Sequence, residues 1–138
     1  MSFLLDANVL LYAFNRDAVQ HAAFHSWLWA TLDADTPVFS TALNEVALLR
    51  ISTGPLRIPA AAAFDFLQDL YGFPNYGRLS LPNSGLPLWQ QLVLSLNLTG
   101  NDVNDAYLAP LALTHDLTLV TADRGFTRFA GLRVLTPE

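Results

Sequence analysis

The stretch of sequence that decides the fold is SFLLDANVLLYAF, residues 2–14. Its first four residues, Ser2–Leu5, predict a buried β-strand, and Asn8–Phe14 predicts an apolar α-helix directly after it. Asp6 lies between the two, an acid inside an apolar run. Open α/β sheets build their binding sites just beyond the carboxyl ends of their strands. A carboxylate at this point therefore indicates a functional role for Asp6.

Outward from this segment, short apolar runs alternate with longer helical patterns. We expect further strands at residues 37–39, 78–81, 117–121 and 132–135, and helices at residues 18–32, 42–52, 60–71, 86–97 and 101–115. Asp17 is placed to cap the helix at residues 18–32, whose apolar face includes Val19. Pro110 predicts a kink or local irregularity in the helix at residues 101–115. This alternation predicts an α/β fold with a mostly parallel sheet of about five short strands, covered on both faces.

Composition narrows the chemistry. The chain has 138 residues, 52% of them hydrophobic, which predicts a single domain over residues 1–138. It contains no Cys and no Lys, so thiolate zinc sites, Cys nucleophiles, P-loop lysines and Schiff-base lysines are excluded. No basic region precedes the N-terminal apolar run, and no apolar segment is long enough to span a membrane. We therefore expect a soluble, cytoplasmic protein with no membrane partner.

Acidic side chains fall at related places in the predicted sheet. Asp123, like Asp6, follows a strand directly, while Glu45 lies in the first turn of the helix after the second strand. Asp102 and Asp105 lie in the first turn of the last helix. Acids in a first turn also suit the positive end of a helix dipole, and Asp123 suits a turn, so capping is the alternative role for these residues. Four separated segments can thus aim carboxylates at one edge of the sheet.

Such a cluster requires a counter-ion. Two carboxylates about 4 Å apart repel by about 4 kcal/mol at an effective dielectric constant of about 20, so several together either take up protons or bind a cation. Oxygen ligands favour Mg²⁺ or Mn²⁺ over zinc. Because Mg²⁺ keeps several waters and shares its coordination with substrate phosphates, the cluster indicates phosphodiester hydrolysis by a metal-activated water.

The segments that carry these acids are LDANVLLYA at 5–13, TALNEV at 41–46, DVNDAYLA at 102–109 and LVTADRGF at 119–126. Together they resemble the four acidic motifs of PIN-domain ribonucleases, and in particular the VapC-type toxins of bacterial and archaeal toxin–antitoxin pairs. The resemblance covers nearly the whole chain. It implies a PIN-like α/β/α sandwich, Mg²⁺- or Mn²⁺-dependent endoribonuclease activity on RNA, a homodimer, and inhibition by a cognate VapB-type antitoxin.

The same resemblance assigns roles to individual residues. It places the metal-binding and catalytic positions on four acids, Asp6, Glu45, Asp105 and Asp123. Asn8 matches a polar residue of the first motif that supports the site, and Thr121 matches the hydroxyl residue before the fourth acid. Asp102 has no firm counterpart and is expected only to support the site from further out. Pro110 departs from the Ala-rich helix that is usual in the family.

The acidic balance argues against a nucleic-acid partner, since 12 Asp and Glu against 7 basic residues give a formal charge of −5. Bound metal would neutralise the site acids and so reduce this objection. Arg16 and Arg124 are predicted to bind substrate, and Arg50 and Arg128 also lie near the motifs, because guanidinium groups bind phosphate well. The alternative is that these are ordinary surface or salt-bridged arginines.

One helix carries a further cluster, of His21, His25 and Trp29. Two His residues four apart can bind metal, but no third ligand accompanies them, so a partly solvated helix face is the simpler interpretation. We expect Trp29 to be exposed and to serve a dimer or antitoxin interface.

Two rival functions stay open. A catalytically silent PIN-fold module would keep the acidic edge only to bind a protein partner. A Mg²⁺-dependent phosphomonoesterase with an aspartate nucleophile would also place an acid after the first strand. Its usual second Asp is Asn8 here, however, and its lysine is absent. The silent module ranks higher because it requires no missing residue.

Overall fold

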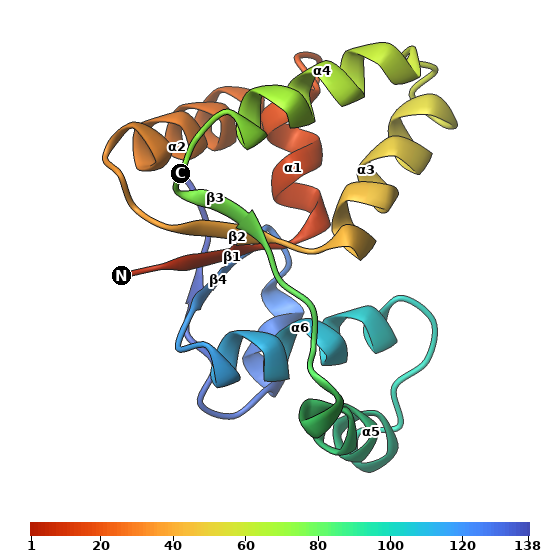
Figure 1. Cartoon of the computed structure of the whole chain (residues 1–138). Helices are drawn as coiled ribbons and strands as arrows, with labels where there is room; N and C mark the ends of the chain where they lie inside the picture. Colours follow the sequence, from red (N-terminus) through yellow and green to blue (C-terminus); the bar gives the residue numbers. More distant parts are fainter.

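Five short strands form a sheet at the centre of the structure (Figure 1), a computed structural model that describes residues 1–138. The strands are β1 Phe3–Leu5, β2 Val38–Ser40, β3 Tyr76–Arg78, β4 Thr118–Val120 and β5 Val134–Leu135. They lie in the order β3-β2-β1-β4-β5, and every neighbouring pair is parallel. The predicted parallel sheet is confirmed, with β1 at its centre.

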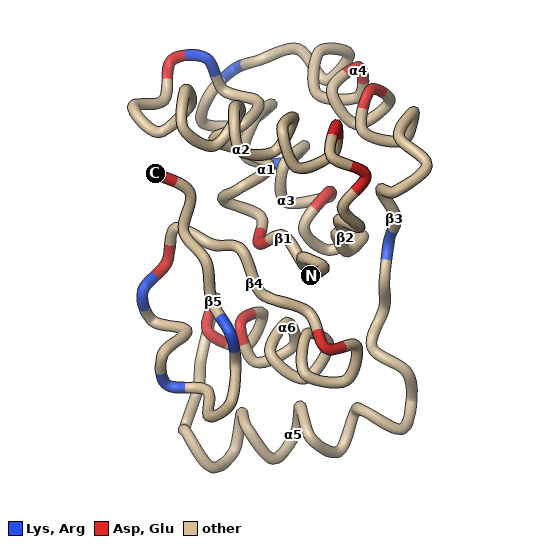
Figure 2. Tube along the Cα trace, turned by 90° about the vertical axis from the view of Figure 1, so that its left-hand side faces the viewer, with Lys and Arg blue, Asp and Glu red and all other residues tan.

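Helices cover both faces of this sheet. They are α1 Ala7–Phe14, α2 His21–Asp33, α3 Ala42–Thr53, α4 Ala60–Tyr71, α5 Leu86–Ser95 and α6 Asp102–Thr114, with 3₁₀ turns η1 Asn83–Gly85 and η2 Arg124–Arg128. Helices α1–α4 lie on one face, and α5 and α6 lie on the other (Figures 1 and 2). This is the predicted α/β/α sandwich. Helix α6 does not break at Pro110. None of the helices combines the length and the apolar character needed to cross a membrane.

Strand β1 supplies two hydrophobic cores, because successive side chains of a strand point to opposite faces of a sheet. Phe3 and Leu5 belong to a core of 15 buried residues shared with α1–α4. Leu4 belongs to a core of 11 buried residues on the α6 side. Because both faces of β1 are covered, its apolar run has no polar alternation, as the sequence pattern predicted.

The order of the strands creates a switch point beside β1. After β1 the chain builds β2 and β3 on one side, and it then returns through α5 and α6 to place β4 on the other side. Ligands bind at such points, beyond the carboxyl ends of the two strands. Asp6 follows β1, and Thr121 and Asp123 follow β4. The topology therefore brings these residues to one place.

Helix α2 begins later than the sequence pattern predicted. It starts at His21, and Asp17 does not cap it. The Asn15 side-chain oxygen accepts the Asp17 backbone N–H at 3.1 Å, and the Ala18 N–H bonds to the Asn15 carbonyl, so a turn precedes the helix. Val19, predicted to lie on the apolar face, is 97% exposed. The local Asn15 turn thus overrides the helical periodicity.

Strand β3 is also displaced, occupying Tyr76–Arg78 instead of 78–81. The Leu79 N–H makes the last bond to β2, at 2.9 Å. The Leu81 N–H instead bonds to the Tyr107 hydroxyl of α6 at 2.8 Å, and the Leu81 side chain is buried in the α6-side core. The chain leaves the sheet here because α6 supplies both an apolar site and a hydrogen-bond acceptor.

Candidate active site

Asp6 is held at the end of β1 through both of its carboxylate oxygens. Oδ1 accepts the Ala7 backbone N–H at 2.7 Å, so Asp6 also caps α1. Oδ2 accepts the Thr121 hydroxyl at 2.8 Å and the Asn8 side-chain N–H at 3.3 Å. Because the residue is only 8% exposed, these partners set its orientation.

Thr121 and Asn8 join the carboxyl ends of β1 and β4. The Thr121 side-chain oxygen accepts the Asp123 backbone N–H at 3.0 Å. The Asn8 side-chain oxygen accepts the Ala122 backbone N–H at 3.1 Å. The Asp123 carboxylate in turn accepts the Gly125 N–H at 2.8 Å. Asn8 and Thr121, predicted to support the site, therefore contact residues of both strand ends.

Three of the four predicted acids, Asp6, Asp105 and Asp123, line one cleft of about 340 Å³. Asp105 comes from the first turn of α6, and Asp102 of the same turn lines the cleft as well. The opposite wall is formed by α3. The other polar residues of the lining are Asn8, Asn44, Arg50, Asn101 and Asn104. Side chains from four separate segments thus meet at the switch point of the sheet.

The acids of this cleft outnumber its cations, and the pKa values of two of them, Asp6 and Asp105, are raised. The pKa of Asp105 rises to about 6, chiefly through burial, with the charges of Asp6 and Asp123 adding to the shift and the hydrogen bond from Arg128 opposing it. Burial also raises the pKa of Asp6. In this structure no three acidic or histidine side chains converge as ligands of one ion. Nevertheless, Asp6, Asp105 and Asp123 provide an all-oxygen donor set with excess negative charge, which fits Mg²⁺ or Mn²⁺.

Arg128 is paired with the acids of α6. Its Nη2 lies 3.0 Å from Asp105 Oδ2 and 3.4 Å from Asp102 Oδ1. The guanidinium carbon lies 4.7 Å from the centre of the Phe129 ring, and Nη1 donates to the Gly125 carbonyl. Phe129 and Gly125 belong to the same segment as Arg128, and they fix the position of its guanidinium. Arg128 can therefore hold the Asp105 side chain in a fixed position.

Glu45 does not line the cleft. Its carboxylate accepts hydrogen bonds from the Tyr71 hydroxyl, from the Tyr76 hydroxyl at 2.9 Å and from Arg78 Nε at 2.8 Å. It is 5% exposed and lies beside a groove between α3 and α4. Burial and the Glu45 charge raise the pKa of Tyr76, which keeps its hydroxyl protonated as a donor. The structure therefore places Glu45 in a network that links α3, α4 and β3.

The residue before Glu45 faces the cleft in its place. The Asn44 side-chain N–H donates to the Leu5 carbonyl at 2.8 Å, and Asn44 lines the cleft. Adjacent residues of an α-helix point about 100° apart. The hydrogen bonds to Tyr71, Tyr76 and Arg78 turn Glu45 away, so Asn44 is the member of the pair that faces the cleft. The motif predicts an acid in this turn, but the partners that draw Glu45 away come from segments distant in the sequence.

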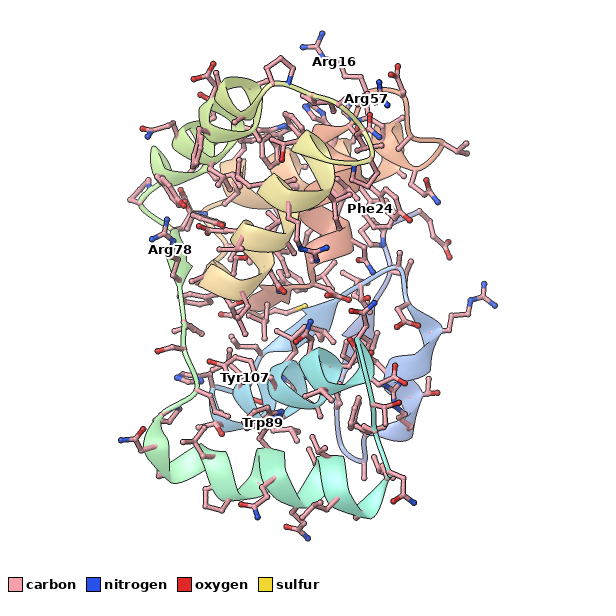
Figure 3. All side chains as sticks on the ribbon, turned by 90° about the vertical axis from the view of Figure 1, so that its right-hand side faces the viewer. Arg16, Phe24, Arg57, Arg78, Trp89 and Tyr107 are labelled. Atoms are coloured by element: carbon pink, nitrogen blue, oxygen red, sulfur yellow. The ribbon has the colours of Figure 1, made fainter.

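The two arginines predicted to bind substrate do not line the cleft. Arg16 lines a separate cavity of about 570 Å³ beyond the end of α1. In Figure 3 it lies at the opposite end of the molecule from Tyr107 of α6. Arg124 is exposed and is also absent from the lining. Arg50 is the arginine that lines the cleft, and nothing in the sequence distinguishes it from Arg16 or Arg124.

The His21–His25 pair lines the separate cavity, with ring centres 5.0 Å apart. His25 Nε2 accepts the Trp29 indole N–H at 2.6 Å, and His21 Nδ1 lies 2.9 Å from the Tyr12 carbonyl. Trp29 is half-buried and packs edge-on against Phe66 of α4, with ring centres 6.3 Å apart. Trp29 is therefore a packing residue between α2 and α4, not the exposed side chain that was expected.

Comparisons with known proteins agree with this architecture. The family model described as PIN domain matches residues 3–132. The chain belongs to the PIN-domain family. Ribonuclease VapC31 of Mycobacterium tuberculosis is 33% identical over 139 residues, which cover 98% of either chain. Ribonuclease VapC25 of the same species is 32% identical over the same shares. The family resemblance found in the sequence is thereby confirmed.

Solved structures share the fold of this PIN domain. VapBC2 from Rickettsia felis, bound to a DNA fragment from its promoter, superimposes with a TM-score of 0.74 at 18% identity, with both chains covered in full. VapC20 of Mycobacterium tuberculosis, a sarcin–ricin loop cleaving toxin, has a TM-score of 0.70 at 16% identity, over 96% of this chain and 99% of that chain. At these identities the likeness concerns the fold, and it confirms the α/β/α sandwich.

The raised pKa of Asp105 predicts how the stability of the metal-free protein depends on pH. The folded state holds a proton up to about pH 6, whereas the unfolded chain releases it near 3.8, so stability falls as pH rises through this window. We expect a higher melting temperature at pH 5 than at pH 7 by calorimetry. Asp105→Asn reduces this difference, and exposed Asp33→Asn does not. An equal difference in Asp105→Asn would contradict the assignment.

The network around Glu45 predicts a stabilising role. Glu45→Ala leaves the buried Tyr76 hydroxyl without its acceptor and should lower the free energy of unfolding by about 1–3 kcal/mol in urea titrations. The double variant Glu45→Ala/Tyr76→Phe has no orphaned hydroxyl. Its loss of unfolding free energy should therefore be smaller than the sum of the losses in Glu45→Ala and Tyr76→Phe. Strictly additive losses would show that the two groups do not interact.

Proposed function

We propose that this PIN domain is an endoribonuclease, the toxin of a toxin–antitoxin pair, that hydrolyses RNA phosphodiester bonds in the cleft between α3 and α6. The observation that carries the proposal is the meeting of Asp6, Asp105 and Asp123, from three distant segments, in one cleft with excess negative charge. Relatives over nearly the full chain that are named ribonucleases support it.

Asp6, Asp105 and Asp123 are the residues that would hold a divalent ion, Mg²⁺ or Mn²⁺. When bound, such an ion lowers the pKa of water to give a nucleophile and stabilises negative charge on phosphate oxygens. The excess carboxylate charge of the cleft supports this assignment. Burial is the main cause of the raised pKa of Asp105, and a cation offsets the repulsion from Asp6 and Asp123 that adds to it. Glu45, engaged with Tyr71 and Arg78, is assigned a structural role.

The neighbours of these acids position them. Thr121 and Asn8 donate hydrogen bonds to one oxygen of Asp6, which favours its ionised form and fixes its direction. Arg128 does the same for Asp105, at 3.0 Å. Each acid thus has a donor that holds it at the cleft, which reduces the reorganisation needed when substrate binds.

The partners follow from the same proposal. The antitoxin would be of the VapB type, because solved neighbours of this fold include VapBC complexes from Rickettsia felis and nontypeable Haemophilus influenzae. The substrate is RNA. A homodimer stays a prediction of the family resemblance, and a cytoplasmic location stays a prediction of the sequence pattern.

One observation favours the second candidate, a catalytically silent interaction module. Glu45 is withdrawn from the cleft, which leaves three of the four motif acids there, with Asp102 beside them. A phosphomonoesterase gains no such support. Asn8 occupies the position of its second acid and is bonded to the Ala122 backbone, and the chain has no lysine.

Asp6→Asn tests the proposed reaction. Loss of its charge removes an ion-binding group, so we expect RNA cleavage in Mg²⁺ or Mn²⁺ to fall by about a hundredfold or more while circular dichroism shows a folded protein. Asp33→Asn, at an exposed acid outside the cleft, serves as the matched control and should cleave normally. Cleavage by Asp6→Asn at the unaltered rate would refute the role of Asp6, and a wild-type protein that neither cleaves RNA nor binds metal would indicate the silent module.

A further inference from the structure

The cleft contains one arginine without a carboxylate partner. Three of the seven arginines, Arg78, Arg128 and Arg133, form salt bridges with acids. Of the other four, only Arg50 lines the cleft. Basic positions are sparse along the whole chain (Figure 2), and Arg16 and Arg57 lie together at the end remote from Tyr107 (Figure 3). Arg50 is therefore the free cation that a substrate in this cleft meets.

Arg50 shares one face of α3 with apolar residues of the cleft wall. These are Leu43, Val46, Ala47 and Ile51. Together with Arg50 they follow the spacing i, i+3, i+4, i+7, i+8, which is one stripe of a helix. Leu43 is 53% exposed and Val46 is 64% exposed, so the stripe is open to a ligand. An apolar stripe that carries a guanidinium is complementary to a nucleotide, because sugar and base present apolar surface and phosphate is bound well by Arg.

The geometry of α3 sets the separation between Arg50 and the acids. Asn44 is bonded at 2.8 Å to the carbonyl of Leu5, the residue before Asp6. Arg50 lies six residues further along the helix, about 9 Å at about 1.5 Å per residue. Stacked nucleotides rise by about 3.4 Å each, so this span corresponds to about two or three nucleotides.

We propose that Arg50 binds a phosphate of the RNA about two or three nucleotides from the bond at the acids, with the intervening nucleotides against Val46 and Ala47. The proposal rests on the ribonuclease function proposed above. Arg50 is a substrate-positioning residue that fixes the direction and register of the strand in the cleft. One well-placed cation thus gives an acidic chain a specific hold on RNA without a basic surface.

Arg50 has one competing role, since it also lies in the last turn of α3, where a cation is favoured by the helix dipole. That role would change the stability of the protein and leave RNA binding unaltered. Measurements of RNA affinity and of urea unfolding on the same variant therefore separate the two.

The first experiment measures RNA binding in an Asp6→Asn background with Mg²⁺, using fluorescence anisotropy of a labelled single-stranded oligonucleotide. We expect Arg50→Gln to weaken binding about tenfold or more and to reduce the slope of log affinity against log salt by about 0.7. Arg50→Lys should restore part of the RNA affinity and part of the salt dependence. Arg57→Gln, at an exposed arginine remote from the cleft, should change neither. In the cleaving protein, Arg50→Gln should raise KM with little change in kcat.

A second experiment locates the phosphate. Single methylphosphonate linkages are placed in turn along a cleaved oligonucleotide. We expect one linkage, about two or three nucleotides from the cut, to weaken binding by Asp6→Asn and to have no further effect on Asp6→Asn/Arg50→Gln. Equal RNA affinity of Arg50→Gln and its parent would overturn the proposal while cleavage by wild type keeps the ribonuclease function. A wild type that neither binds nor cleaves RNA would overturn both.

Discussion

The hydrogen bonds that join the carboxyl ends of β1 and β4 are the constraint on which the candidate site depends. Thr121 donates to Asp6 at 2.8 Å and accepts from the Asp123 backbone, while Asn8 spans the same two strands. These bonds exist because β1 and β4 are parallel neighbours, in register from Phe3 opposite Thr118 to Leu5 opposite Val120. Only in a parallel pair do both carboxyl ends meet at one edge, so the two acids are brought together by strand order itself.

The charged side chains around this junction have different roles, although the chain as a whole is acidic. Asp6 is buried and Asp105 is half-buried, both have raised pKa values, and their repulsion suits a divalent ion. Arg128 is used within the protein to hold Asp105. Arg50 stays without a partner in the same cleft. The formal charge of −5 therefore describes neither the field at the cleft nor its ability to hold a phosphate backbone.

Glu45 shows how a motif acid can be recognised and still be misplaced. Its motif is present in the sequence, and its helix α3 was predicted closely, yet its carboxylate is bound by Tyr71, Tyr76 and Arg78. Those residues follow Glu45 by 26, 31 and 33 positions, and no local pattern links them to it. The arginines were misjudged for a similar reason. Proximity to a motif in the sequence does not say which face of a helix a side chain occupies, and Arg50 was distinguished from Arg16 only by packing.

Local patterns of the sequence were sufficient to predict the α/β class, the parallel sheet, the family and the acids that follow β1 and β4. Buried strands between helices, and a carboxylate at the end of an apolar run, are local patterns with one physical interpretation. The start of α2, the displacement of β3, the orientation of Glu45 and the free guanidinium of Arg50 were decided by tertiary structure. Each of these depends on a partner distant in the chain or on a competing turn, such as Asn15 before α2 or Tyr107 beside Leu81. Local propensity differs by too little free energy to outweigh a buried hydrogen bond or an apolar site that such a partner supplies.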